Sequence, residues 1–498
     1  MKKLNPFLVV LLLTLVHYLL FYGESDGLNA FLYSSMIFTY LFARDKKLPK
    51  LPQLLLICSH GLAAGGVLLI NSSWSIFMYV LTFAFAVASY HEQDRKSILL
   101  MLPSIVANLV VAPFRTITLP RVPKRITRNS GKRKLAFKVT IIPVLIVGFF
   151  TILYSAGNPI FGEWVEGLMN NVGNFIEDLL GNLSFVKFLF LILGFWIGSY
   201  AIVYGGIKVF GEFDSQLKLK LRRIRRPRPS AFFNKMTDLR KEYVIAVMVF
   251  GAMNFLLLVI NTIDMSWVWF AFDRSDVENL SQFVHEGTYV LILSILISMS
   301  LILFYYRGNL NFYPKSKSLD RLAELWLFQN FILAVSIAIR NWHYIAAYNA
   351  ITYKRIGVFV FLILVVVGLV SVFLKIRQKH TIVSVVRTNV VAALVTLSIF
   401  SVFNWDGVIA RYNLTAAPPE EINYSYLRTL SDGSLPAIED HAENLLENGG
   451  ESQRERALKL KQHVRYRLSN RESRNSSHSW VSWNLRDYQL SKMSYDEN

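Results

Sequence analysis

Apolar residues along this chain gather into long runs, and polar segments, many of them basic, separate the runs. A helix needs about 20 apolar residues to cross a hydrocarbon core about 30 Å thick. The pattern therefore predicts an all-α fold, a polytopic transmembrane helical bundle of about eleven spans. The expected spans are 6–22, 28–43, 51–70, 75–90, 139–155, 185–204, 243–263, 289–306, 322–340, 356–374 and 383–403.

One further apolar run, 98–114, differs from the others. Pro103 lies inside it, Pro113 lies near its end, and basic residues flank it on both sides. A crossing segment would place one of these basic clusters on the wrong face of the bilayer. We therefore expect a re-entrant or interfacial segment whose backbone is satisfied by neighbouring helices. The alternative is a twelfth span, which would reverse the orientation of every later element.

The pattern divides the chain into three parts. Residues 1–134 hold the N-terminal membrane helices, the segment 98–114 and a basic cytoplasmic loop, and residues 135–403 hold the main transmembrane bundle. Residues 404–498 follow the last span and contain helical patterns, one of which begins with Ser and Pro and ends at Gly. We expect this tail to form a small helical C-terminal domain outside the membrane.

Composition supports the membrane class. The 498 residues are 53% hydrophobic and only 17% charged, against roughly 25% charged residues in soluble domains. Cys58 is the single cysteine, so no disulfide can form within the chain.

The distribution of charge predicts an orientation. With the N-terminus in the cytoplasm, the inner segments carry 36 Lys and Arg against 9 Asp and Glu, and the outer loops carry 5 against 11. This is the asymmetry that the positive-inside rule describes. With the 12 Lys and Arg and 14 Asp and Glu of the tail, it accounts for the formal net charge of +19 without any nucleic-acid partner. An odd number of spans then places the tail on the extracytoplasmic side.

The inner segment 217–230, LKLKLRRIRRPRPS, alternates leucines with cations. It fits two interpretations: an anchor of the kind that the positive-inside rule requires, or a surface for anionic lipid headgroups on the cytoplasmic side. A cation near such a membrane surface contributes about 1 kcal/mol of binding. The candidate lipid contacts are Lys218, Lys220, Arg222, Arg223, Arg225, Arg226 and Arg228.

A polar stripe follows the ninth span in the segment SIAIRNWHYIAAYNAITYKR. Its members, Ser336, Arg340, Tyr344, Tyr348 and Thr352, are spaced by four, so each step drifts by about 40° around a helix. A continuous helix from 322 to 352 would measure about 46 Å, longer than the hydrocarbon core. The helix therefore either emerges on the outer side or breaks near residue 341.

Arg340 has three possible roles at the outer boundary. It could reach the interface as an anchor, it could form an ion pair with Asp264 or Asp406, or it could hold an anionic ligand beside Tyr344 and Tyr348. A lone guanidinium deep in lipid costs at least about 2.5–3.5 kcal/mol, so a partner or an escape route is required.

Catalysis has no positive signal in the sequence. The nine histidines are scattered without metal-ligand spacing, and neither a P-loop nor a G-x-S-x-G nor an H-E-x-x-H motif occurs. We expect no enzyme, no metal and no cofactor.

Several stretches together resemble a known family. These are YSAGNPIF, VHEGTYVLIL, SIAIRNWHYIAAYNAITYKR, FNWDGVIARYN and YSYLRTLSDGSLPAI. The chain is similar to bacterial polytopic membrane proteins grouped as a domain of unknown function of the 4153/4173 type, from about Tyr154 into the tail. The resemblance implies a location in the bacterial cell (inner) membrane and no agreed activity. Its positions correspond here to Arg340, Tyr344, Tyr348, Thr352, Arg355, Asn404, Asp406, Arg411, Tyr412 and Asn413, whereas Asn423 stands where the family suggests an aspartate.

These observations favour one functional hypothesis. The two polar segments could meet at the outer face, with Asp406 and Arg411 bonding Arg340, Tyr344 and Tyr348 and so holding the tail on the bundle. The protein would then be a non-catalytic envelope module that binds a protein partner or a ligand at its outer face. A transporter or flippase for a lipid or small amphiphile is the alternative.

Overall fold

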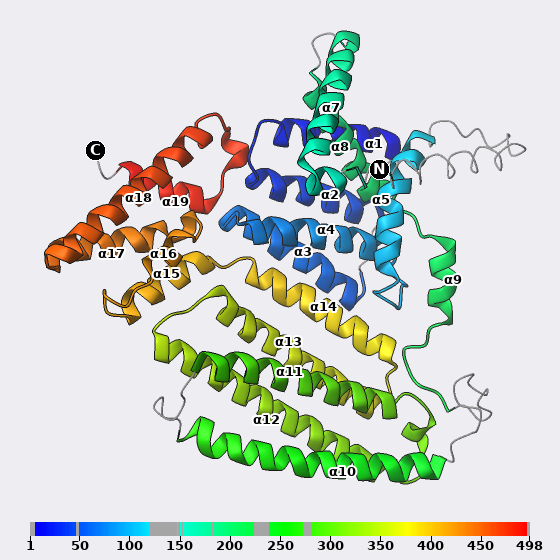
Figure 1. The fold of residues 1–498 in the computed structure, drawn as a ribbon. Coiled ribbons are helices and arrows are strands. Elements are labelled where there is room, and N and C mark those ends of the chain that lie inside the picture. Colours follow the sequence, from blue (N-terminus) through cyan, green and yellow to red (C-terminus); the bar gives the residue numbers. More distant parts are fainter. Residues whose placement is uncertain are drawn as a thin grey trace, which may run out of the picture. The chain divides into compact units, whose positions relative to one another are not determined.

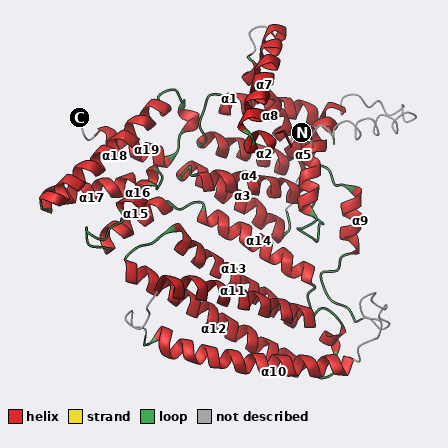
Figure 2. Ribbon diagram, in the orientation of Figure 1, coloured by secondary structure: helices red, strands yellow, loops and turns green. Residues whose placement is uncertain are grey.

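The computed structural model describes residues 5–45, 49–118, 147–180 apart from 148, 149 and 152, 184–223, 239–271 and 280–495. The predicted span 139–155 lies largely outside the described residues. Within them the fold is all-helical and contains no strand, as Figure 2 shows. The predicted fold class is confirmed at that level.

Contacts between residues group the chain into two compact units. Unit 1 comprises residues 1–25, 32–48 and 105–205, and unit 2 comprises 26–31, 49–104 and 206–498. The tail thus belongs to the same unit as the later membrane helices. The three predicted domain boundaries stay a prediction.

Unit 1 is built on an antiparallel helix pair. Gly194 and Gly198 lie against α1: a Cβ on Gly194 would stand 2.9 Å from the side chain of His17, and one on Gly198 3.4 Å from Leu13. Such small residues let membrane helices approach closely. The helices of this unit are α1 (Pro6–Phe21), α7 (Pro159–Leu180) and α8 (Phe185–Val203), together with most of α2 (Leu28–Asp45) and α5 (Met101–Thr118).

Unit 2 holds a bundle of long helices and the tail (Figure 1). The bundle helices are α3 (Leu51–Leu69), α4 (Ser73–His91), α10 (Leu239–Asp264) with the π-helical turn Met265–Trp269, α11 (Leu280–Tyr305), α12 (Ser316–Tyr348), α13 (Tyr353–Gln378) and α14 (Ile382–Phe400). The short α9 (Lys208–Gln216) lies between α4 and α10 in the order of unit 2. The tail consists of α15 (Trp405–Ala416), α16 (Tyr424–Arg428), α17 (Leu435–Asn448), α18 (Glu451–Asn475) and α19 (Leu485–Tyr495).

The bundle helices turn apolar side chains outward and polar ones inward. Met248, Phe255 and Leu258 on α10 are more than half exposed, whereas Asn254 and Asn261 on the same helix are buried. This inverted arrangement suits a hydrocarbon surround, where polar groups must find partners inside the protein. In the described part of the chain, nine helices are long and apolar enough to cross a membrane, which supports a multi-pass membrane protein.

A polar seam joins the parallel helices α10 and α12. The side chain of Gln329 donates to the Asn254 Oδ1 over 2.7 Å, and the Asn254 amide donates to the Leu322 carbonyl over 3.0 Å. One heptad further along, the Asn261 amide donates to the Gln329 carbonyl over 3.1 Å. Contacts that repeat every seven residues are the signature of two helices packed side by side in a left-handed crossing.

The fold bears on two predictions about individual segments. Helix α12 runs unbroken through residue 341 and ends at Tyr348, where Asn349 adopts the left-handed conformation (φ 47°) that often follows a helix end. Most of the second segment, 98–114, lies in one continuous helix, α5, which begins at Met101 and has Pro113 inside it. That helix reaches the length and apolarity of a span.

The tail contacts the first inter-helix turn of the chain. The backbone N–H of Leu28 donates to the carbonyl of Trp483 over 2.9 Å. Beside it, a Cβ on Gly27 would stand 2.5 Å from the Ser482 carbonyl oxygen. Residues from opposite ends of the sequence therefore meet backbone to backbone in unit 2.

Helix α3 approaches the end of α14 closely at one glycine. A Cβ on Gly66 would lie 2.7 Å from the Ser401 carbonyl oxygen, whereas one on Gly65 meets nothing within 4 Å. We expect Gly66→Ala to destabilise the protein by about 1–3 kcal/mol, because the obstruction is backbone. Gly65→Ala is the matched control and should be neutral or stabilising, since Ala is the better helix former. Thermal unfolding of both variants in detergent measures this, and equal melting temperatures would contradict it.

Candidate binding site at the bundle–tail junction

Arg340 forms a buried ion pair with Asp264. The two side chains are 10% and 6% exposed, and a terminal guanidinium nitrogen donates to Asp264 Oδ1. Asp264 is one of the two partners predicted from the sequence, and Asp406 is not the partner found. The pair connects α12 to the last residue of α10, at the end of the polar seam.

The π-helical turn after Asp264 adds two contacts to this level of α12. The Trp269 indole N–H donates to Ser336 Oγ over 2.9 Å, and His343 Nε2 bonds the Val268 carbonyl over 2.8 Å. A π turn shifts the following side chains around the helix, and such turns are frequent at functional positions. Ser336 and Arg340, the first members of the predicted stripe, thus both face α10.

The later members of the stripe face the turn between α12 and α13. The guanidinium of Arg355 lies 3.4 Å from the ring centre of Tyr344, and the ring centres of Tyr344 and Tyr348 are 4.5 Å apart with the planes tilted by 39°. The Asn341 amide donates to the Arg355 carbonyl over 3.0 Å. Thr352 is the residue before α13 and accepts from the Arg355 N–H through its backbone. Because the stripe winds slowly around α12, its first members face α10 and its later members face the turn between α12 and α13.

The tail is held on this turn by contacts other than the expected ones. Asn413 on α15 accepts from the Ile351 N–H over 2.6 Å and donates to the Ile351 carbonyl over 3.0 Å. Asp406 accepts from Ser431 Oγ over 2.5 Å and from the Tyr353 hydroxyl. Arg411 is exposed on α15, and Tyr412 beside it is half-buried. The expected bonds from Asp406 and Arg411 to Arg340, Tyr344 and Tyr348 are not the ones that the structure contains.

The candidate lipid contacts on the basic segment are partly described. Lys218, Lys220, Arg222 and Arg223 are all exposed, and Arg225, Arg226 and Arg228 lie outside the described residues. The segment pairs with the turn between α13 and α14, where the Leu221 N–H donates to the Lys379 carbonyl over 2.7 Å. Burial and the nearby charge of Lys220 both lower the pKa of His380 at this turn.

A cavity of about 780 Å³ opens where the bundle meets the tail. That volume is within the roughly 300–1,000 Å³ range of small-molecule sites. Its walls come from the turn between α3 and α4, one face of α13, the end of α14 and five residues of the tail. The lining residues are Ile70, Asn71, Ser72, Ser73, Trp74, Tyr353, Gly357, Val360, Phe361, Leu364, Leu397, Phe400, Phe403, Asn404, Trp405, Asp406, Ser431 and Arg486.

The cavity is apolar along the bundle and polar beside the tail. On α13 its lining runs from Tyr353 to Leu364, about 16 Å along the helix axis at 1.5 Å per residue. Trp74, Phe361 and Phe403 are each more than a third exposed, so the apolar wall is open on one side. The shape is that of a groove. We call its polar side, which includes Asn71, Asp406, Ser431 and Arg486, the roof.

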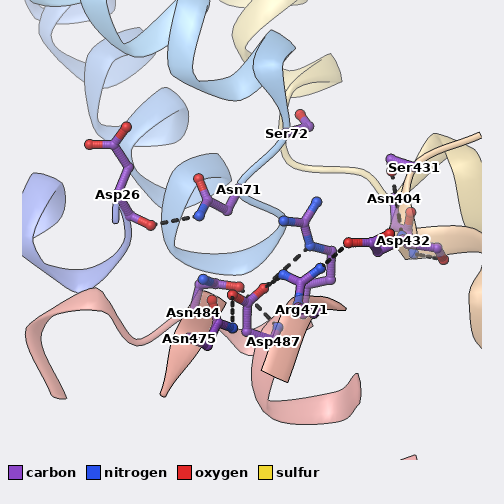
Figure 3. A network of polar contacts seen from close by, with 12 residues as sticks. Asp26, Asn71, Ser72, Asn404, Ser431, Asp432, Arg471, Asn475, Asn484 and Asp487 are labelled. Atoms are coloured by element: carbon purple, nitrogen blue, oxygen red, sulfur yellow. Dashed lines mark hydrogen bonds and ion pairs between the residues drawn. The ribbon is translucent and has the colours of Figure 1, made fainter. Parts of the chain in front are cut away.

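A network of arginines and aspartates supports the roof (Figure 3). Arg471 bonds Asp432 over 2.5 Å and also bonds Asp487, while Arg467 bonds Asp432 over 2.5 Å. Burial alone would raise the pKa of Asp432, but the hydrogen bond and charge of Arg467, with Arg471 and Arg486 nearby, hold it below its usual value. Figure 3 also shows Asn71 donating to the Asp26 carbonyl, over 2.6 Å. The turn between α1 and α2 and the turn between α3 and α4 are thus bonded to each other beside this network.

Reactive groups are sparse around this site. Among the described residues, no three His, Cys, Asp or Glu side chains gather as metal ligands would. The arrangement offers recognition chemistry instead: hydroxyl groups, amides and one side chain of each charge beside an apolar groove.

A family model now places the chain. The model described as a domain of unknown function, DUF4153, matches residues 54–441. The chain belongs to this family. The match begins well before Tyr154, so it includes α3 and α4 as well as the later bundle, and it ends within α17. No curated protein and no solved structure matches the chain.

Sequence reasoning missed the groove and the seam. The residues of the roof, among them Asn71, Ser431 and Arg486, are far apart in the chain and carry no shared motif. The seam did leave a signal, because Asn254 and Asn261 are seven residues apart within an apolar run, as are Gln329 and Ser336. Amides at that spacing in a span indicate a helix interface.

The ion pair permits a direct test of which partner Arg340 has. Arg340→Met leaves Asp264 buried without its cation, so we expect a loss of about 3–5 kcal/mol. Adding Asp264→Asn should recover much of that loss, which gives a large coupling energy in a double-mutant cycle. The same cycle between Arg340 and Asp406 should be additive. Denaturant titration in detergent provides the four free energies of each cycle, and a coupling that is larger with Asp406 would refute the assignment.

Proposed function

We propose that this protein is a non-enzymatic module of the bacterial cell membrane that binds an amphiphilic ligand at its outer face, in the groove between bundle and tail. The observation that carries the proposal is the division of the groove into an apolar wall and a polar roof. Amphiphiles have the same division, so one end of the ligand matches each part of the site.

The depth of the groove supports a ligand taken from one leaflet. Its lining follows α13 for about 16 Å, close to half of a hydrocarbon core about 30 Å thick. The exposed rings of Trp74, Phe361 and Phe403 give the groove an open side, through which an acyl chain could enter without leaving the hydrocarbon. The tail, which supplies Ser431 and Arg486, would stand at the level of the headgroups.

Charge at the opposite ends of the unit 2 bundle supports an extracytoplasmic tail. Far from the tail, Lys375, Arg377 and Lys379 close α13 next to the basic segment 217–223, and Lys315 and Lys317 open α12. The turns on the tail side carry few cations. Under the positive-inside rule the basic end is cytoplasmic.

Helix α5 fits an interfacial position better than a crossing one. Asn108 and Arg115, two turns apart, both bond Gly205, which lies just beyond the end of α8: Asn108 accepts from its N–H over 3.1 Å and Arg115 donates to its carbonyl over 3.2 Å. Trp196 on α8 also donates to the Leu109 carbonyl of α5, so adjacent residues of α5 contact positions nine residues apart near α8, which fits a steep crossing of the two helices. With α5 at the interface, the eleven spans predicted from the sequence are odd in number, and the proposed tail is outside.

Labelling of single cysteines tests the orientation. In a Cys58→Ser background, Ser477→Cys marks the tail and Ser318→Cys marks the start of α12; both positions are exposed. We expect an impermeant maleimide to label position 477 in intact spheroplasts, and position 318 only after lysis. The reverse pattern would place the tail in the cytoplasm and remove the outer-face site.

Filling the groove tests ligand binding. Gly357 lines the cavity, and a Cβ there meets nothing within 4 Å, so Gly357→Leu should occupy the groove without straining the helix. We expect this variant to lose at least about tenfold in retained lipid, which corresponds to about 1.4 kcal/mol. Lipid co-purified in mild detergent is counted by native mass spectrometry.

Gly251→Leu is the matched control, since Gly251 lies in α10, away from the groove, and also has open space around it. Loss of bound lipid in Gly357→Leu with retention in Gly251→Leu supports the proposal. Equal retention in both variants would refute it. Accelerated lipid exchange between leaflets in reconstituted vesicles would instead support the flippase alternative.

A further inference from the structure

The roof of the groove contains two opposite charges that are not paired with each other. Of the described residues that line the cavity, Arg486 and Asp406 are the charged ones. Arg486 comes from α19 at the end of the tail, and Asp406 comes from the first turn of α15. Within the described part of the chain, these two residues do not form an ion pair with each other.

Arg486 is the surplus cation of the roof network. Asp432 and Asp487 are engaged by Arg467 and Arg471 at 2.5 Å or less, while Arg486 reaches Asp487 only at 3.5 Å through Nε. Its side chain is only 14% exposed. Burial and the neighbouring charge of Arg471 lower the pKa of Arg486, and the carboxylates of Asp487 and Asp432 offset only part of that effect. An anion from a ligand would therefore compensate a charge that the protein neutralises incompletely.

Asp406 is an anion with capacity to spare. Its carboxylate accepts from Ser431 Oγ and from the Tyr353 hydroxyl, both neutral donors. A carboxylate has about four lone-pair sites, so two hydroxyl groups leave room for a cationic donor. Asp406 is 9% exposed, and a buried charge without a counter-charge is costly.

We infer that the groove selects a zwitterionic amphiphile whose headgroup combines a phosphate with a primary ammonium. The phosphate lies at Arg486, whose planar guanidinium suits bidentate contact with phosphate. The ammonium lies at Asp406 and donates to its carboxylate. The acyl chains follow the apolar face of α13. This inference rests on the proposed function and adds the chemical class of the ligand.

The charge balance distinguishes this headgroup from simpler ones. An anionic phospholipid with a neutral headgroup supplies the phosphate for Arg486 but no cation for Asp406. A choline headgroup carries a cation without N–H donors, so it cannot hydrogen-bond the carboxylate. An aminophospholipid satisfies both residues, and the neutral donors Asn71, Ser72 and Asn404 around the roof impose no further charge.

The test compares three lipids on the full-length protein. Purified protein is titrated by native mass spectrometry with phosphatidylethanolamine, phosphatidylglycerol and phosphatidylcholine of identical acyl chains. We expect phosphatidylethanolamine to bind about tenfold more tightly than either of the others, the effect of one charge-assisted hydrogen bond. Free phosphoethanolamine, which has no acyl chains, should compete only weakly. Competition as strong as that of the whole lipid would mean a soluble zwitterion, and would overturn the inference.

Variants of the two charged residues assign the two halves of the headgroup. Asp406→Asn keeps the shape and should remove the preference for phosphatidylethanolamine over phosphatidylcholine without weakening phosphatidylglycerol. Arg486→Gln should weaken all three lipids, because each carries the phosphate that Arg486 would bind, and Arg486→Lys should restore part of the affinity. Tyr353→Phe removes one neutral donor from Asp406 and should keep the preference, which controls for local rearrangement; melting temperatures of all variants exclude misfolding.

Failure of this inference is distinguishable from failure of the proposed function. Binding of all three lipids with equal affinity, still abolished by Gly357→Leu, would overturn the headgroup assignment and leave the amphiphile site intact. Preference for phosphatidylglycerol that Asp406→Asn does not change would also overturn it. Lipid binding that Gly357→Leu does not weaken would refute the groove as the binding site.

Discussion

The structure depends on the requirement that polar groups inside a bilayer find their partners within the protein. Each unsatisfied group in hydrocarbon costs several kcal/mol. The α10–α12 seam meets this requirement with Asn254, Asn261 and Gln329, which bond one another and the helix carbonyls. At the end of the seam the same requirement makes Arg340 and Asp264 a pair. Long apolar helices are thereby fixed in one parallel register.

The same requirement for hydrogen-bond partners applies at the junction between the bundle and the tail. Asn413 satisfies both backbone groups of Ile351 in the turn after α12, and Asp406 gathers hydroxyl groups from α13 and the tail. The tail therefore completes the bundle, and unit 2 includes it. The groove lies where bundle and tail do not fill the space between them. There the apolar walls of the bundle meet the polar roof. A site of this composition can recognise a molecule without reacting with it.

Sequence patterns predicted the helices well and the contacts unevenly. Span length and apolarity are local properties, so the segments around α3, α8, α10 and α13 were found within a few residues. The pairing of Arg340 with Asp264 was foreseeable, because few carboxylates stand near that level of the membrane. Asp406 was an equally reasonable partner on that argument, and only the packing of α10 beside α12 decides between them. The roof was beyond prediction, since Asn71, Ser431 and Arg486 meet only after four separate segments have folded.

The meeting of Leu28 with Trp483 has a consequence for biogenesis. The turn before α2 leaves the ribosome among the first elements of the chain, and the strip of backbone that covers it emerges among the last. Contacts so distant in sequence form late, after the cost of closing a very long loop. During synthesis the membrane helices must therefore persist without this contact. A nascent chain that stops before residue 483 would insert its helices yet leave the turn before α2 without its partner from the tail.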